Sequence, residues 1–392
     1  MYDPSTPSEL ESLSIKYRIE EITGAQFSKD NRVQLLKSGY ETFRKIHACI
    51  SAAKNIICAE FYIFKDDDTG KIISEILKEK SLQGVKVYLL YDHFGSFLTS
   101  RDFWQDLKKA GVKLRASHPF KWSSPRRYIY RNHKKLLIID GEKAFTGGFN
   151  IADEYHGYWK KKILWKDTGI YLEGPIASTL LSIFRESWAT WGGEPISFNS
   201  NAPKPAAQGV PVIPIFARSG RARRKMRRLF IHSITHAKRS IYITTAYFMP
   251  GRRILKMLER AAQRGVDLRI LLPSQADVTS INYAGKAYYK RLLKAGVKIY
   301  NYQDAVLHSK TAVFDGAWSI AGSTNLDFQS LRRNEESNVG ILDMDFGKKM
   351  TQAFQEDLRH SVRIDAETWN NRPFHQKLLE KFFSLIMRKL LS

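Results

Sequence analysis

One pattern of residues occurs twice in this sequence, and the two copies are 175 positions apart. Each copy reads His-x-Lys, four further residues and Asp, then six residues before Gly-(Gly/Ser)-x-Asn, beginning at His133 and at His308. Segments outside the pattern repeat as well, since Gly84–Leu90 resembles Gly265–Leu271. A chain that repeats over such a length is expected to fold as two similar units.

Both units read as strands alternating with helices, which indicates an α/β fold with parallel or mixed central sheets. Residues 70–83 and 252–264 are the equivalent predicted helices. The 392 residues of the chain suffice for two lobes of roughly 150–200 residues each. We therefore expect an N-terminal lobe at 1–198, a linker rich in Pro, Ala and Asn at 199–220, a C-terminal lobe at 221–365 and a tail at 366–392.

The residue types in the pattern suit the binding of a phosphate. Because side chains alternate across a strand, His-x-Lys on a strand places the His and the Lys on the same face. The glycines that follow let the backbone approach a bound anion closely, and Lys and Asn side chains donate to its oxygens. Histidine titrates near neutral pH, so it can act as a nucleophile or as an acid.

Two copies of the pattern supply what a single copy cannot. Phosphodiester transfer through a covalent intermediate needs one His to attack phosphorus. A second His must protonate the departing alcohol and then deprotonate the incoming one. Two Lys and two Asn around one phosphate would neutralise the developing charge. We therefore expect no metal ion and no other cofactor.

With these motifs the sequence resembles the phospholipase D superfamily, and within it the bacterial cardiolipin synthases of the short form without N-terminal membrane spans. The resemblance covers roughly residues 33–361. It implies two homologous lobes, related by a pseudo-twofold axis, that pack around one shared active site. The residues it places around the phosphate are the two motif sets: His133, Lys135, Asp140 and Asn150, and His308, Lys310, Asp315 and Asn325.

The same resemblance implies a carboxylate downstream of each motif that holds the catalytic histidine. Asp167 and Glu336 match these positions, although the neighbouring Glu335 leaves the second assignment open and a surface ion pair is the alternative for both acids. Tyr62 and Tyr247 match aromatic positions that line the pocket of the family. Packing in the core is the alternative role for these two tyrosines.

The charge of the chain indicates a polyanionic partner. The 63 Lys and Arg residues exceed the 39 Asp and Glu residues and give a net charge of +24, which suits nucleic acid or anionic lipid. Residues 117–135 mix aromatic with basic side chains, as expected at a membrane interface or on single-stranded nucleic acid. Residues 375–391 predict a basic amphipathic helix that lies on a membrane, with packing on the lobe as the alternative.

These observations favour a phosphatidyltransferase that makes cardiolipin from two phosphatidylglycerols and releases glycerol, through a phosphatidyl-histidine intermediate. The alternatives are a hydrolytic phospholipase D, a nuclease of the same superfamily and a catalytically silent membrane-binding protein. The expected partners are anionic phospholipid and the membrane surface, and nucleic acid only for the nuclease. We expect a monomer at the periphery of the bacterial cell membrane. The sequence leaves open which histidine is the nucleophile and which alcohol is the preferred acceptor.

Overall fold

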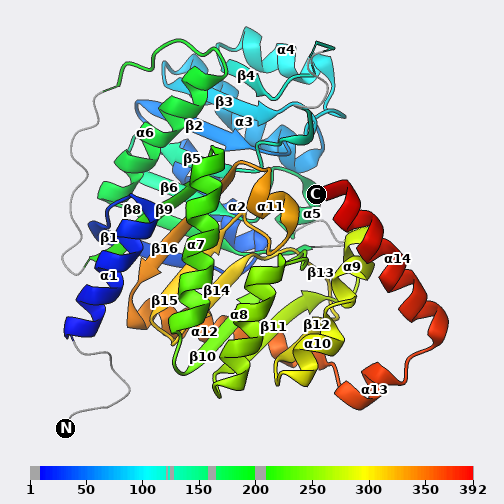
Figure 1. Ribbon diagram of the computed structural model, residues 1–392. Coiled ribbons are helices and arrows are strands. Elements are labelled where there is room, and N and C mark those ends of the chain that lie inside the picture. The colour runs from blue at the N-terminus through cyan, green and yellow to red at the C-terminus, as the bar shows by residue number, and fades with distance from the viewer. Residues whose placement is uncertain (1–8, 121, 124–127, 158–164, 199–208, 392) are drawn as a thin grey trace.

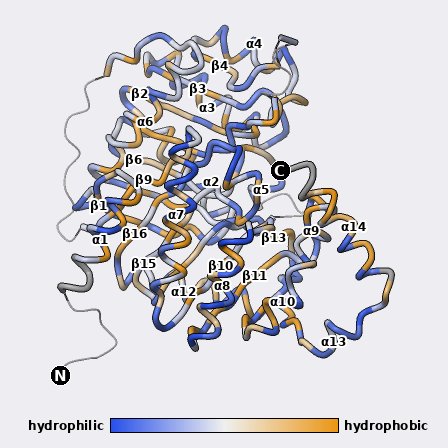
Figure 2. Tube along the Cα trace, viewed as in Figure 1, coloured by the Kyte–Doolittle hydropathy of each residue, from blue (hydrophilic) through white to orange (hydrophobic). Residues whose placement is uncertain are grey.

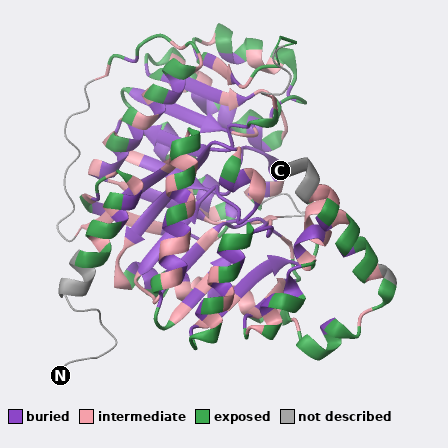
Figure 3. Cartoon of the chain, in the orientation of Figure 1, coloured by how far each residue is buried: buried purple, intermediate pink, exposed green. Residues whose placement is uncertain are grey.

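The computed structural model describes residues 9–120, 122–123, 128–157, 165–198 and 209–391. Fifteen of the described strands form one large mixed sheet with helices on both faces (Figure 1), and two short strands form a separate sheet. This arrangement confirms the predicted α/β class. Figure 3 shows that the strands are buried throughout most of their length, while the helices expose their outer faces. Apolar positions accordingly follow the strands in Figure 2, as expected for a sheet that is covered on both sides.

The first repeat alternates strands and helices, and an N-terminal helix precedes it. Strand β2 is buried at every position and helix α3 begins after Asp67, whose side chain accepts a hydrogen bond from the Gly70 N–H. The elements are α1 (Glu9–Thr23), β1 (Ser28–Leu36), α2 (Gly39–Ser51), β2 (Ile56–Phe61), α3 (Asp68–Leu82), β3 (Lys86–Asp92), α4 (Arg101–Lys109), β4 (Lys113–Ser117), β5 (Lys135–Ile139), β6 (Lys143–Gly147), α5 (Asp153–His156), β7 (Trp165–Lys166), β8 (Gly169–Glu173) and α6 (Pro175–Thr190).

The second repeat follows the same order and ends in additional helices. Its elements are β9 (Val210–Ala217), α7 (Gly220–His236), β10 (Ser240–Thr244), α8 (Arg252–Gln263), β11 (Asp267–Pro273), α9 (Thr279–Lys286), α10 (Tyr289–Lys294), β12 (Lys298–Tyr302), β13 (Val306–Leu307), β14 (Thr311–Phe314), β15 (Trp318–Gly322), α11 (Phe328–Arg332), β16 (Glu336–Leu342), α12 (Met344–Arg359), β17 (Ser361–Arg363), α13 (Ala366–Asn370) and α14 (Phe374–Leu391).

The order of the strands has a pseudo-twofold arrangement. From the centre outwards the first repeat contributes β1, β8, β6, β5, β2, β3 and β4, and the second contributes β9, β16, β15, β14, β10, β11 and β12, with β17 added at the edge. Equivalent neighbours pair in the same sense: β2–β3 and β10–β11 are parallel, while β5–β6 and β14–β15 are antiparallel. The central pair β1–β9 joins the two lobes into one sheet.

Two predicted boundaries differ from the structure. Part of the expected linker, residues 199–208, lies outside the described residues, and Val210–Ala217 forms strand β9 in the centre of the sheet. The two prolines of this segment indicated a linker, but its Val, Ile and Phe residues supply a buried strand. Residues 1–198 were expected to belong to the first lobe, and helix α1 lies within this range. Its Ile19 and Ile22 instead lie in the core of the second, beside α7.

Candidate active site

Each histidine of the repeated motif lies just before a central strand, on a segment that pairs with the opposite lobe. The His133 N–H donates to the Glu335 carbonyl oxygen at 2.9 Å, and the Glu335 N–H donates to the carbonyl oxygen of Arg131 at 2.8 Å. In the other half β13 pairs with β7, and the His308 N–H donates to the Lys166 carbonyl oxygen at 2.8 Å. The two lobes therefore hold each other's histidine segments by reciprocal backbone hydrogen bonds.

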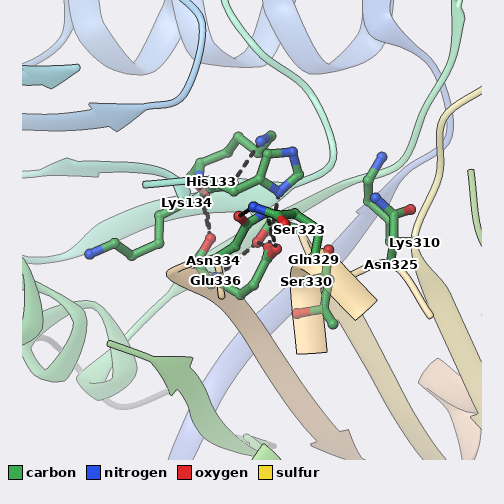
Figure 4. A network of polar contacts seen from close by, with 12 residues as sticks. His133, Lys134, Lys310, Ser323, Asn325, Gln329, Ser330, Asn334 and Glu336 are labelled. Atoms are coloured by element: carbon green, nitrogen blue, oxygen red, sulfur yellow. Dashed lines mark hydrogen bonds and ion pairs between the residues drawn. The ribbon is translucent and has the colours of Figure 1, made fainter. Parts of the chain in front are cut away.

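The carboxylates that hold the histidines are exchanged between the lobes. His133 Nδ1 lies 3.0 Å from Glu336 Oε2 of the second repeat, as Figure 4 shows. His308 Nδ1 lies 2.6 Å from Asp167 Oδ2 of the first repeat. The sequence singled out both acids, but it did not indicate that each serves the histidine of the other repeat. Glu335 contacts His118 and Lys134 instead.

The surroundings of each carboxylate fix its orientation. Glu336 accepts hydrogen bonds from Ser323 Oγ and, at 3.3 Å, from Asn334 Nδ2. Asp167 accepts from the Thr168 N–H at 2.7 Å, and burial raises the pKa of Asp167 to about 6. With Nδ1 committed to a carboxylate, Nε2 is the ring nitrogen of each histidine that can react.

The electrostatics of the two histidines follow from burial and from the lysine of the same motif. Burial, and then the charge of Lys135, lower the pKa of His133. Burial, followed by Lys310, lowers the pKa of His308 well below its usual value. Burial and the neighbouring lysine therefore favour the neutral imidazole at both positions, and the Glu336 carboxylate opposes this effect at His133.

The lysine of each motif donates a hydrogen bond to the backbone of the histidine in the same motif. Lys135 Nζ donates to the His133 carbonyl oxygen at 2.8 Å, and Lys310 Nζ donates to the His308 carbonyl oxygen. Burial lowers the pKa of Lys310 to about 8 and lowers the pKa of Lys135 well below its usual value. A bound phosphodiester anion would favour the charged form of both ammonium groups.

The two asparagines have their side-chain oxygens fixed by the backbone. Asn150 Oδ1 accepts from the Ile63 N–H at 3.1 Å, and Asn325 Oδ1 accepts from the Tyr247 N–H at 3.3 Å. Donation is therefore left to the amide nitrogens, and Asn150 Nδ2 meets the Tyr155 hydroxyl at 2.7 Å. This arrangement lets each lobe present an amide N–H to the oxygens of a bound anion.

The histidines and asparagines of both repeats line one cavity of about 440 Å³, and the motif lysines are not among its lining residues. Its lining includes both histidines, both asparagines and the two predicted tyrosines: His133, His308, Asn150, Asn325, Tyr62 and Tyr247. The Tyr62 ring packs against His133, with ring centroids 5.1 Å apart, so Tyr62 lies at the cavity rather than in the core. A larger cavity, about 610 Å³, lies between α6 and α7 and contains none of the predicted site residues.

The motif aspartates do not lie at this cavity, which corrects the expectation that Asp140 and Asp315 share the catalytic site. Both follow the far end of their strand from the lysine, and both have a positive φ of 53°, which suits the short polar side chain of Asp in a turn. Each carboxylate accepts three backbone N–H hydrogen bonds of 2.7–2.9 Å, from Lys54, Asn55 and Ile56 to Asp140, and from Lys238, Arg239 and Ser240 to Asp315. Their role is to fix the turn that ends the motif strand.

A buried ion cluster behind His133 was missed by the sequence reasoning. Lys134 extends away from His133 in Figure 4 and its Nζ lies 2.9 Å from Glu60 Oε1 and 2.7 Å from Glu335 Oε2. Burial opposes the ionisation of Glu335, yet Lys134 lowers its pKa to about 2. The sequence contained a signal for this cluster. Lys134 lies within the motif and Glu60 within an apolar strand, and a buried charge of either sign requires a charged partner.

Both repeats of the chain are similar to known proteins. Residues 46–188 and 230–358 match the family model described as "Cardiolipin synthase, PLD-like domain". The chain belongs to this phospholipase D-type family. "Cardiolipin synthase 2" of Bacillus cereus is 36% identical over 375 residues, which cover 94% of this chain and 73% of that protein. "Cardiolipin synthase" of Geobacillus kaustophilus is 35% identical over 387 residues, which cover 98% of this chain and 76% of that protein.

A solved structure supports the fold of this phospholipase D-type enzyme. The phosphatidylserine synthase of Haemophilus influenzae superimposes with a TM-score of 0.70, covering 96% of this chain and 99% of that protein at 16% sequence identity. At such low identity the likeness concerns the fold alone. Among the described helices, none combines the length and the apolar content needed to cross a bilayer.

Proposed function

We propose that this phospholipid phosphatidyltransferase makes cardiolipin from two molecules of phosphatidylglycerol and releases glycerol. One observation carries the proposal: two histidines, each paired with a buried carboxylate of the opposite repeat, line the same cavity. The cavity then acts as one active site shared by the lobes. A single chain supplies every group that the reaction needs, so the enzyme acts as a monomer.

In the first step, Nε2 of one histidine attacks phosphorus and forms the phosphatidyl-histidine. The other histidine, protonated on Nε2, gives its proton to the glycerol oxygen as the bond from phosphorus to that oxygen breaks. Lys135 and Lys310, with Asn150 and Asn325, hold the non-bridging oxygens and stabilise their charge. This set of donors performs the stabilisation with the chain's own residues, so the mechanism uses no metal ion.

In the second step, the neutral histidine takes the proton of a hydroxyl group on the second phosphatidylglycerol. The hydroxyl oxygen attacks phosphorus, the bond from phosphorus to the first histidine breaks, and cardiolipin leaves. One phosphodiester replaces another, so no further energy source is required. Water must lose this competition although it is present at about 55 M, which an aligned lipid hydroxyl achieves because oriented groups reach effective molarities on the order of 10⁵ M.

Exposed apolar side chains beside the cavity support action at a membrane surface. Phe94 lines the cavity and is 55% exposed, and Phe97 and Leu98 of the same loop are 69% and 87% exposed. Part of the aromatic and basic segment predicted to contact lipid, including Arg126 and Arg127, lies outside the described residues. Large exposed apolar groups near a lipid site suit insertion at the headgroup level. We place the enzyme at the periphery of the bacterial membrane.

Helix α14 has two apolar faces. One face packs on the lobe, and we propose that the other lies on the membrane. Phe383 stacks on Tyr283 of α9, with centroids 5.7 Å apart, and Ser384 is buried. The sequence predicted a basic stripe on this helix that includes Ser384, and the burial of Ser384 corrects that position. The side chains of Arg388 and Leu390 lie outside the described residues. The described part of α14 exposes five large apolar residues, one of which is Leu379. The other four share the outer face of the helix, visible in Figure 3: Phe374, Leu378, Phe382 and Leu385.

Replacing these four exposed residues of α14 with Ser is expected to weaken binding to phosphatidylglycerol vesicles by about a hundredfold or more, since each apolar side chain that enters the interface contributes on the order of 1 kcal/mol. Vesicle sedimentation measures the effect. The exposed Tyr17 and Leu82, replaced together with Ser, are the control and should leave binding unchanged. Equal binding of the α14 variant and the wild type would restrict this helix to packing on α9.

Purified enzyme supplied with phosphatidylglycerol in mixed micelles tests the reaction itself. We expect glycerol and cardiolipin in equal amounts, with little phosphatidic acid, and phosphatidyl-alcohols when a short alcohol is added. Headgroup-resolved lipid analysis measures the three lipid products, and an assay of the aqueous phase measures glycerol. Phosphatidic acid as the main product would identify a hydrolase. Salt-sensitive cleavage of single-stranded DNA without consumption of lipid would identify a nuclease.

A further inference from the structure

Arg131 is a buried cation at the cavity that the mechanism above does not use. It lines the cavity, lies two positions before His133 and is 7% exposed. Its guanidinium carbon lies 3.8 Å from the ring centroid of Tyr128 and 5.2 Å from that of Phe94. Within the described part of the chain, neither Nη1 nor Nη2 of Arg131 has a hydrogen-bonding partner.

The nearest carboxylate does not supply those hydrogen bonds. Arg131 forms an ion pair with Asp92, but Asp92 Oδ1 lies 3.6 Å from Arg131 Nη1, which is beyond hydrogen-bonding distance. The oxygens of Asp92 already accept from three backbone N–H groups at 2.9–3.1 Å, those of Phe94, Gly95 and Asn132. Leaving buried donors without partners is costly, so this guanidinium is prepared for an acceptor that comes from outside the chain. Its two terminal nitrogens match two oxygens of a phosphate.

Arg131 has no equivalent arginine in the second repeat. The residue 175 positions after Arg131 is Val306, which lies in β13 and pairs with Trp165 of β7. The four groups that hold the reacting phosphate come in symmetric pairs, two from each lobe, whereas this arginine serves one side of the cavity. An asymmetric cation suits a reaction in which two anionic lipids enter one site in different roles.

We propose that Arg131 binds the phosphate of the acceptor lipid during the second step. The inference rests on the proposed function. The attacking hydroxyl of phosphatidylglycerol is three carbons from its own phosphate, so that second phosphate must bind close to the phosphatidyl-histidine. Arg131 thereby selects an alcohol that carries a phosphate over water and over neutral alcohols, and it aligns the hydroxyl for attack. The recognised chemistry is a phosphate group on the acceptor.

The test compares a charged with a neutral acceptor at the same phosphatidyl-histidine. Wild type, Arg131→Gln and the control Arg332→Gln receive phosphatidylglycerol micelles with ethanol. Arg332 is exposed and is not among the residues that line the cavity. For Arg131→Gln we expect the ratio of cardiolipin to phosphatidylethanol to fall at least about tenfold, the effect of losing charge-assisted hydrogen bonds, while phosphatidylethanol formation is retained. Arg332→Gln should keep the wild-type ratio. An unchanged ratio in Arg131→Gln, or an equal loss of both products, overturns the inference.

A competition experiment with inorganic phosphate tests whether a free anion can replace the lipid headgroup at Arg131, and it requires no variant. Added to the wild type, inorganic phosphate is expected to compete at Arg131 and to suppress cardiolipin more than phosphatidylethanol. Equal suppression of the two products would place the anion at the reacting phosphate and overturn the inference, even where Arg131→Gln fails to fold. A wild type that makes phosphatidylethanol but no cardiolipin would instead overturn the proposed function.

Discussion

Replacing either His133 or His308 with Ala is expected to abolish the release of glycerol and the formation of cardiolipin. The two rings act as one unit, because the attack by one requires the proton supplied by the other. In such units the loss of one member costs about as much as the loss of all, on the order of 10⁶-fold in turnover. The double variant should therefore be no less active than either single variant.

The control for this experiment is His47→Ala, which removes an exposed histidine on α2 and should leave turnover unchanged. Thermal unfolding should show that both His variants remain folded. More than about a tenth of the wild-type turnover in either variant is incompatible with the pairing of a nucleophile and an acid, since a loss of one such group costs far more than tenfold.

The spacing of the repeat indicated which residues of the two lobes meet at the candidate site, because the position of each residue on its strand follows from local sequence. An α/β repeat places equivalent residues at equivalent strand ends, so His133 and His308, with their lysines and asparagines, were expected to meet at one place. The helices predicted at 70–83 and 252–264 correspond to α3 and α8 within two residues at each end. Hydrophobic periodicity is strongest in such segments.

Contacts between the lobes are not determined by local rules. The exchange of Asp167 and Glu336 depends on how β7 meets β13 and how the segment before His133 meets Glu335, and no periodicity within one segment reports this pairing. The backbone conformation of Asp140 could not be predicted from the sequence either. Its positive φ makes it a turn residue, although its place in the motif resembled that of a catalytic group.

The exchange of carboxylates leads to a second prediction with a large effect. Asp167→Asn should inactivate the site through His308, and Glu336→Gln should inactivate it through His133. An amide keeps the size of the side chain but can hold the imidazole in the wrong tautomer, and the same change in a serine protease triad costs about 10⁴ in turnover. We expect the rate of cardiolipin synthesis, measured on phosphatidylglycerol micelles, to fall on the order of 10³–10⁴-fold in each variant.

A phosphatidyl ester of p-nitrophenol distinguishes exchanged from local pairing, because its leaving group departs without a protonated histidine. The covalent intermediate is trapped by acid and the modified histidine is located by mass spectrometry. If the wild type carries the phosphatidyl group on His133, Asp167→Asn should still form the intermediate and Glu336→Gln should not. If the group is on His308, the two results should be reversed. A modified histidine that depends on the carboxylate of its own repeat would contradict the exchange, whereas the expected dependence also identifies the nucleophile.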